Sequence, residues 1–198
     1  MTNEVIQNII TRRSIKQYKD QQITDEELQT VLDAGLYAPS GMGMQSPVMV
    51  VVQDKDTMAQ IVRMNAAVMN ATSNPYYDAP TVILVLAPTD RTTYIEDASC
   101  VLDTMMLAAH SIGLASRWIH RERQMFETEE GKELMKKWGI PENFEVSEHW
   151  LSDMLTVNFL SQRRDEKAGS STQINKNEKM RWDFVSHLIF RFDCLMVL

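Results

Sequence analysis

The chain has little cysteine, no long apolar run and no excess of positive charge, and each shortage excludes a class of protein. Only Cys100 and Cys194 occur among the 198 residues, without CxxC or Cys/His spacing, so the sequence predicts neither a disulfide framework nor a metal site. No apolar stretch approaches the roughly 20 residues that a membrane helix needs. The net charge of −7 argues against nucleic acid as a partner. Since no signal peptide is visible, we expect a cytoplasmic protein without membrane contact.

Proline and glycine are spread unevenly along the chain. Pro141 is the last proline, and Gly169 is the only glycine from residue 140 onward. Residues 161–181 are polar without a clear period, and the apolar tail after them fits neither a clean strand nor a strong amphipathic helix. The composition of the chain therefore changes after Pro141.

Helical and strand patterns alternate along the body of the chain, the part before Pro141. Apolar residues at helical spacing predict helices, and short apolar runs between turn residues predict strands that are covered on both faces. The predicted helices span residues 4–11, 25–38, 57–69, 97–112 and 128–138, and the predicted strands span residues 47–53, 80–87 and 114–119. This alternation favours an α+β fold close to a three-layer α/β arrangement, with a mixed central sheet flanked by helices.

Two local signals mark helix ends. Thr24 followed by Glu27 is a capping box, in which the Thr24 hydroxyl accepts from the third helical N–H and the Glu27 side chain reaches back. Gly113 follows the long helix at a position where the left-handed conformation favours glycine. Asp97 and Glu96 are interpreted as charges at a helix start rather than as a catalytic pair.

A basic cluster follows the first helix. Arg12, Arg13, Ser14 and Lys16 place three cations and a hydroxyl within five residues. Such a group is suited to hold a phosphate, because Arg and Lys supply charge-assisted donors. A solvated basic turn is the alternative that spacing alone leaves open.

Two further stretches could contact a ligand. Residues 38–47 join a helix to a buried strand, with two glycines that permit close backbone approach. Residues 113–121 run from a helix end through a strand to a polar turn, where Trp118 could lie against a planar cofactor or fill the core. The four histidines show no ligand spacing, and the chain has no GxSxG, Walker or GxGxxG motif.

These stretches match the motifs of one family in order and interval. Residues 12–18 are similar to its RRSIRxY motif, and residues 38–47 are similar to APSxxxxQP with Ser46 inserted before the final proline. Residues 74–83 are similar to xPYYxAPTVI, and residues 108–119 are similar to AAHSLGLGSCWI. The chain therefore resembles the FMN-dependent nitroreductases over about residues 4–146. Four ordered matches favour a phosphate site over a solvated turn at the basic cluster.

The resemblance implies a set of cofactor-binding residues. Those at the phosphate, ribityl chain and pyrimidine edge of FMN are Arg12, Arg13, Ser14 and Lys16. Those in the loop that reaches FMN, in this family usually from the partner subunit, are Pro39, Ser40, Gly41 and Gln45. Those along the isoalloxazine are Trp118, Ile119, His120 and Arg121. A backbone amide near His120 or Arg121 would face flavin N5. Asn65 is matched to a polar contact with the ring.

The resemblance also implies a mechanism and a partner. Hydride passes from NADH or NADPH to FMN, and an electron-poor small molecule such as a nitroaromatic or quinone then takes it in a ping-pong order. Because the flavin carries the chemistry, no catalytic side chain is expected. The family normally forms an intertwined homodimer. Two alternatives stay open, namely a catalytically impaired flavin-binding remnant and a related flavin chemistry such as dehalogenation or flavin destruction.

The sequence departs from the family after Val146. The family continues with a core strand, a Gly-Tyr turn and a basic segment, and residues 147–198 show none of these. One back-translation of residues 147–160, regrouped from its third base, encodes GALVIGYADGELP, which is the expected strand and turn. Trp150 and Met154, which have single codons, fit this regrouping. A shifted reading frame after Val146 is therefore our hypothesis for the segment. The resemblance thus implies an FMN-binding domain over residues 1–146, and we expect an atypical, poorly ordered segment over residues 147–198.

Overall fold

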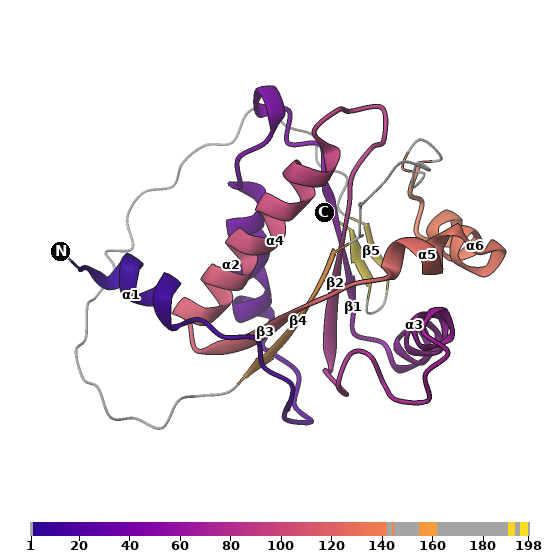
Figure 1. Cartoon of the computed structure of the whole chain (residues 1–198), viewed down its shortest axis with the longest axis horizontal. Coiled ribbons are helices and arrows are strands. Elements are labelled where there is room, and N and C mark those ends of the chain that lie inside the picture. Colours follow the sequence, from indigo (N-terminus) through magenta and orange to yellow (C-terminus); the bar gives the residue numbers. More distant parts are fainter. Residues whose placement is uncertain (1, 142–143, 145–154, 162–189, 193–194, 198) are drawn as a thin grey trace.

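The computed structural model places a sheet between two groups of helices (Figure 1). It describes residues 2–141, 144, 155–161, 190–192 and 195–197. The helices are α1 (Glu4–Thr11), α2 (Asp25–Leu36), α3 (Lys55–Val68), α4 (Tyr94–Ser111), α5 (Glu122–Glu127) and α6 (Glu129–Lys137), with a short 3₁₀ turn at Gly41–Gly43. The strands are β1 (Val48–Val52), β2 (Thr81–Leu86), β3 (Leu114–Ile119), β4 (Leu155–Ser161), β5 (Phe190–Phe192) and β6 (Leu195–Val197).

The sheet has the strand order β3-β4-β2-β1-β6-β5. Its neighbouring strands pair antiparallel, with Val50 opposite Leu84 between β1 and β2. Ser14 adds a parallel bridge to Ser116 on β3, so both pairing directions occur. This confirms the predicted mixed sheet flanked by helices, and the bridge attaches the predicted basic cluster to the edge of the sheet.

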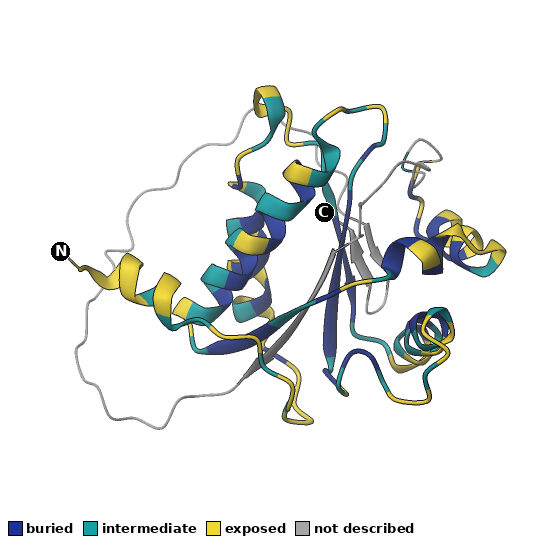
Figure 2. Cartoon of the chain, in the orientation of Figure 1, coloured by how far each residue is buried: buried dark blue, intermediate teal, exposed yellow. Residues whose placement is uncertain are grey.

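The two faces of the sheet bury different cores. Met49 and Val51 of β1 pack with α2 and α4 on one face, while Val50 and Val52 pack with α3, α5 and α6 on the other. The alternation follows from the two-residue period of a strand. Because both faces are covered, every residue of β2 is buried (Figure 2). This is the arrangement that the continuous apolar runs predict.

The helix ends follow local chemistry. The capping box of α2 is confirmed, since Glu27 N–H donates to Thr24 Oγ1 at 3.2 Å and Thr24 N–H donates to Glu27 Oε2 at 2.8 Å. Gly113 has φ 85°, as predicted for the end of α4. α4 begins at Tyr94, three residues before the predicted start. The sequence prediction missed α5, which is only six residues long and begins with charged side chains.

Helix α1 leaves its apolar side chains in solvent. None of its residues is buried, and Val5 is 65% exposed and Ile10 53% exposed (Figure 2). It is anchored to α4 by Asn8 Nδ2, which donates to Leu107 O at 2.8 Å. An amphipathic helix whose apolar face has no cover within the described chain is suited to contact another molecule.

Strands β4, β5 and β6 all belong to the segment after residue 146. β4 is inserted between β3 and β2, and β6 pairs with β1. The sequence predicted no clean strand in this segment, so these short strands were missed. The predicted poor order of residues 147–198 concerns positions that lie mostly outside the described residues.

Candidate functional site

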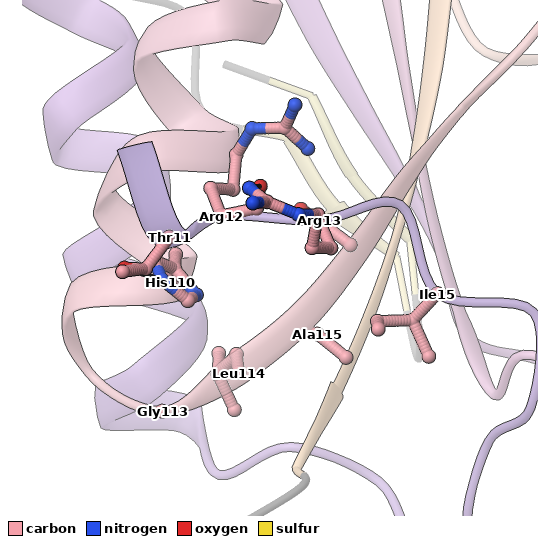
Figure 3. Close-up of a pocket in the computed structure, with 9 residues that line it drawn as sticks. Thr11, Arg12, Arg13, Ile15, His110, Gly113, Leu114 and Ala115 are labelled. Carbon is pink, nitrogen blue, oxygen red and sulfur yellow. Dashed lines mark hydrogen bonds between the residues drawn. The ribbon is translucent and has the colours of Figure 1, made fainter. Parts of the chain in front are cut away.

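A pocket of about 150 Å³ lies where the end of α1 meets the end of α4 and the start of β3 (Figure 3). Its lining joins the predicted basic cluster to the predicted strand segment. The lining residues are Thr11, Arg12, Arg13, Ile15, His110, Gly113, Leu114, Ala115 and Ser116. The bridge between Ser14 and Ser116 holds these two segments together, although about a hundred residues separate them in the sequence.

Two polar atoms from the pocket lining are buried without a partner. Arg12 Nη1 and Ser116 Oγ have no hydrogen-bond partner within the described residues. A buried donor without a partner costs about 1–3 kcal/mol, and more when it is charged. A bound ligand could satisfy both atoms. A guanidinium and a hydroxyl that line one pocket are suited to bind an oxyanion such as a phosphate. Arg12 is therefore the part of the basic cluster best placed to bind one.

The other members of the basic cluster are arranged differently. Arg13 also lines the pocket, but its Nη1 already donates to Ile10 O at 2.8 Å and to Arg12 O at 2.7 Å. It thereby caps the end of α1. Ser14 and Lys16 are exposed. Of the basic cluster, Arg12 and Arg13 therefore line the pocket, and only Arg12 has a buried nitrogen without a partner among the described residues.

Tyr18 holds the chain after the cluster. Its hydroxyl donates to Ile15 O at 2.9 Å. Burial raises the pKa of the Tyr18 phenol far above its ordinary value, while nearby Arg117 acts in the opposite direction. The Arg117 guanidinium in turn lies 4.8 Å from the ring centre of Tyr77. These contacts fix the basic segment against the middle of β3.

His110 closes the pocket on the side of α4. Its Nε2 lies 3.0 Å from Thr11 Oγ1, which also donates to Gln7 O (Figure 3). The contact joins the last turns of α1 and α4. The sequence prediction gave His110 no role, and a pair separated by 99 positions leaves no local signal that could have found it.

The predicted residues at the end of β3 divide between core and surface. Ile119 is buried in the core under α5 and α6. Trp118 is half-buried, its Nε1 has no partner among the described residues, and its ring centre lies 5.9 Å from that of His120. His120 is exposed, and Arg121 adopts φ 82°, a left-handed conformation unusual for a residue with a side chain.

Asn65 is brought to this strand end from α3. It is fully buried, and its Nδ2 lies 3.2 Å from His120 O. The same nitrogen lies 3.2 Å from Tyr76 Oη and from Glu122 Oε1. The family resemblance matched Asn65 to a polar contact with the flavin ring and did not place it at the end of β3. It did not identify Tyr76 or Glu122 as neighbours.

The predicted loop from Pro39 to Gln45 is held by its own side chains. Ser40 Oγ donates to Gln45 Oε1 and accepts from Gln45 N–H at 2.9 Å. Gln45 Nε2 donates to Leu36 O at 2.6 Å and to Ala38 O at 3.0 Å. Ser40 and Gln45 therefore shape the loop, which presents Met42 with 87% of its surface exposed.

Asp97 fastens this loop to the first turn of α4. Gly41 N–H donates to Asp97 Oδ1 at 2.7 Å, and Thr93 Oγ1 donates to Asp97 Oδ2 at 3.2 Å. Arg91 Nη2 adds a bond to Gly41 O at 3.3 Å. Asp97 is buried, so its role is wider than the predicted charge at a helix start. The 56 positions between Gly41 and Asp97 explain why sequence spacing could not show the contact.

The loop lies beside the start of α4, whereas the end of α1 and the start of β3, which line the pocket, lie beside the end of α4 (Figure 1). The loop is bound to Asp97 in the first turn, whereas His110 in the last turn lines the pocket. A helix of 18 residues is about 27 Å long at about 1.5 Å per residue. Within one chain, therefore, the structure brings together the basic cluster and the strand segment but not the loop.

Within the described ranges, no group of three or more His, Cys, Asp or Glu side chains could hold a metal ion. In the same part of the chain, no helix has the length and apolar character needed to cross a membrane.

Comparison with known proteins adds a family to this geometry. The model described as the Nitroreductase family matches residues 9–149. A protein of Archaeoglobus fulgidus named "Putative NADH dehydrogenase/NAD(P)H nitroreductase" is 32% identical over 149 residues, which are 72% of this chain and 80% of that protein. The FMN reductase (NAD(P)H) of Bacillus subtilis is 29% identical over 137 residues, and the match spans 58% of this chain but only 53% of that protein.

A solved structure shows the same fold. The crystal structure of a nitroreductase with bound FMN from Desulfitobacterium hafniense superimposes with a TM-score of 0.71 at 25% identity. The match covers 90% of this chain and all of the other. A match of this extent continues past residue 149, where the family model ends.

Proposed function

This chain belongs to the nitroreductase family, and we propose that it binds FMN at the pocket between α1, α4 and β3 and transfers hydride from NADH or NADPH to an electron-poor small molecule. The fold matches the expected nitroreductase fold. The observation that carries the proposal is the buried, unpaired Nη1 of Arg12 at the pocket, within the described chain. A phosphate would satisfy this donor.

The residues present fit FMN beyond the phosphate. Ser116 Oγ and Trp118 Nε1 are further buried polar atoms without a partner in the described residues, and both lie on β3, the strand that borders the pocket. Asn65 Oδ1 is a third, at the far end of β3. A flavin extends from a phosphate through a polyol to a polar ring system. Two of these atoms lie on β3 and the third lies on α3 beside the end of that strand, which matches this pattern.

The chain's own residues would bind and orient the cofactor. We propose that Arg12 binds the phosphate with Arg13, Ser14 and Lys16 at its rim, and that the backbone at His120 and Arg121 faces the reactive edge of the ring. FMN, when bound, would supply hydride acceptance and donation at N5. The protein then needs to position the two substrates, and the proposal assigns no side chain as acid, base or nucleophile.

We propose that the site is completed in a homodimer. The loop from Pro39 to Gln45 lies at the other end of α4 from its own pocket, so a second copy is the source that fits the geometry. The exposed apolar face of α1 supports an interface beside the pocket. NAD(P)H and a nitroaromatic or quinone would occupy this shared site in turn, in a ping-pong order.

The binding experiment is a titration of the purified chain with FMN and with riboflavin, which lacks the phosphate. We expect Arg12→Gln to weaken FMN binding by about 10- to 150-fold, corresponding to a charged hydrogen bond of about 1.5–3 kcal/mol. Riboflavin affinity should change little. Arg63→Gln is the matched control, since it removes an exposed guanidinium of α3 that does not line the pocket. Equal losses for FMN and riboflavin would contradict the assigned phosphate contact.

The catalytic experiment follows NADH and NADPH oxidation by the FMN-loaded chain with a nitroaromatic or a quinone as acceptor. Double-reciprocal plots should be parallel when both substrates are varied, as a ping-pong order requires. A chain that stays colourless with added FMN would favour the alternative of an impaired remnant. Turnover of a halogenated phenol, or loss of FMN itself, would instead indicate a related flavin chemistry.

We propose further that residues 147–198 are translated from a shifted frame, although strands β4 and β6 of this segment pair within the sheet of the body. The family model ends at residue 149, close to Val146, and one back-translation of residues 147–160, regrouped from its third base, encodes a strand and a Gly-Tyr turn. Sequencing the source DNA across the Val146 codon tests the hypothesis. A chain repaired to GALVIGYADGELP should bind FMN more tightly than the present one. A continuous frame in the source DNA would refute it.

A further inference from the structure

Three buried polar side chains lie together behind the end of β3. Asn65 of α3, Tyr76 and Glu122 at the start of α5 each have none of their surface exposed. They come from three separate segments of the chain. The proposed function uses only Asn65, so Tyr76 and Glu122 need an explanation of their own. A carboxyl group fully removed from water is costly unless its surroundings hold it.

Asn65 is the shared donor of this cluster. Its Nδ2 lies 3.2 Å from Glu122 Oε1, from Tyr76 Oη and from His120 O. An amide nitrogen has two hydrogens, so these three acceptors compete for its two N–H bonds. Burial, and next the charge of Glu122, raise the pKa of Tyr76 well above its ordinary value, which keeps the phenol protonated. The cluster thus couples a carboxyl group to a backbone carbonyl.

That carbonyl belongs to a strained turn. Arg121 has φ 82° and ψ 3°, and a side-chain-bearing residue in this region costs about 1–2 kcal/mol. Strain of this kind persists only where the surroundings enforce it. Two groups flank the strained residue, since Asn65 binds the carbonyl of His120 before it and Glu122 is buried directly after it. Together they determine where the peptide between His120 and Arg121 points.

We propose that Glu122 is a positioning residue which, through Asn65, fixes the His120–Arg121 peptide in the orientation that flavin hydride transfer requires. This inference rests on the proposed function, which places that peptide at the reactive edge of FMN. Glu122 does not touch the cofactor in this proposal. The Glu122 carboxyl group binds the side-chain amide of Asn65, and that amide binds the carbonyl oxygen of His120.

The first test replaces Glu122 in the FMN-loaded chain. We expect Glu122→Ala to slow reduction by NADH on the order of 100-fold, the usual effect of a misplacement of about 1 Å, with less than a tenfold change in FMN affinity. The visible flavin spectrum should shift, because contacts at the ring change. Glu122→Gln retains an acceptor for Asn65 and should recover most of the rate. Glu133→Ala removes an exposed carboxylate from the neighbouring helix α6 and is the matched control.

The second test needs no cofactor. Trypsin cleavage after Arg121 reports opening of the turn when its rate is divided by the rate for the same bond in the unfolded chain, because the residue after the cleaved bond also changes. We expect Glu122→Ala to raise this ratio at least about tenfold in the cofactor-free chain. Glu133→Ala should leave it unchanged. Glu122→Ala and Asn65→Ala should also be non-additive, because they act through one contact.

The outcomes separate the two proposals. Unchanged cleavage and an unchanged flavin spectrum in Glu122→Ala would overturn the positioning role. Equal damage from Glu122→Gln and Glu122→Ala would also overturn it, because the glutamine keeps the geometry. If the wild-type chain binds no FMN, the proposed function fails, while cleavage after Arg121 still decides whether Glu122 holds the turn.

Discussion

Gly41 offers a sharp test of how the Pro39–Gln45 loop is fastened to α4. A Cβ added at Gly41 would overlap Thr93 Oγ1 and lie 3.2 Å from Thr93 Cβ. Thr93 cannot simply turn away, because its hydroxyl donates to Asp97 Oδ2. Gly41→Ala must therefore break either that bond or the 2.7 Å bond from Gly41 N–H to Asp97 Oδ1. A hydrogen bond to a charged group contributes about 1.5–3 kcal/mol, which is the loss of stability we expect.

A double-mutant cycle isolates this overlap. Thr93→Ala removes the hydroxyl that the new methyl group would meet, so Gly41→Ala should cost at least about 1 kcal/mol less in that background. Urea unfolding measures both free energies. Gly43→Ala is the control, since Gly43 has open space around it and φ 65°, and its cost of about 1–2 kcal/mol should not depend on Thr93. Additive effects of Gly41→Ala and Thr93→Ala would refute the reasoning.

Three further predictions concern stability and assembly. Glu27→Ala should lower the free energy of unfolding by about 0.5–2 kcal/mol in urea melts, because Thr24 N–H loses its acceptor; an unchanged midpoint would contradict the capping role. Ile9→Asp should raise the dissociation constant of the proposed dimer roughly a hundredfold or more, as measured by light scattering. The substitution would place one buried charge from each subunit in the proposed two-fold interface. Raised pKa values mean that Tyr18 and Tyr76 keep their protons above pH 10, where unfolded tyrosines lose them. The free energy of unfolding that these raised pKa values contribute is therefore fully present below pH 10. It should fall by about 1.4 kcal/mol per pH unit per tyrosine above pH 10, and Tyr76→Phe should make that fall less steep.

The parts of the fold that were predictable from the sequence are those set by local pattern. The continuous apolar runs of β1 and β2, the Thr24 capping box and Gly113 each act within a few residues. Helix α5 was missed because Glu122 and Arg123 look like a solvated turn, whereas both are buried. Only the packing of α3 against the end of β3 reveals that burial.

In the candidate site, too, local features were predictable from the sequence and long-range contacts were not. The basic cluster was found as a local run of charge, but spacing could not show that Arg12 turns inward while Arg13 caps α1. Contacts between Thr11 and His110, or between Gly41 and Asp97, join residues that are far apart in the chain. The tertiary fold creates them, so a single sequence read for local pattern contains no trace of them.

The position of the loop relative to the pocket makes a final prediction about assembly. If each site takes Arg12 from one subunit and the Asp97-anchored loop from the other, a mixed dimer of Arg12→Ala and Asp97→Ala chains has one site with both defects and one with none. Random mixing makes half of the dimers mixed, so about one quarter of the wild-type sites should return. Each variant alone should stay impaired. If the loop served its own chain's pocket, every site in the mixed dimer would carry one defect, and activity after mixing would not rise. Recovery on mixing therefore reports which subunit supplies the loop, independently of the identity of the acceptor.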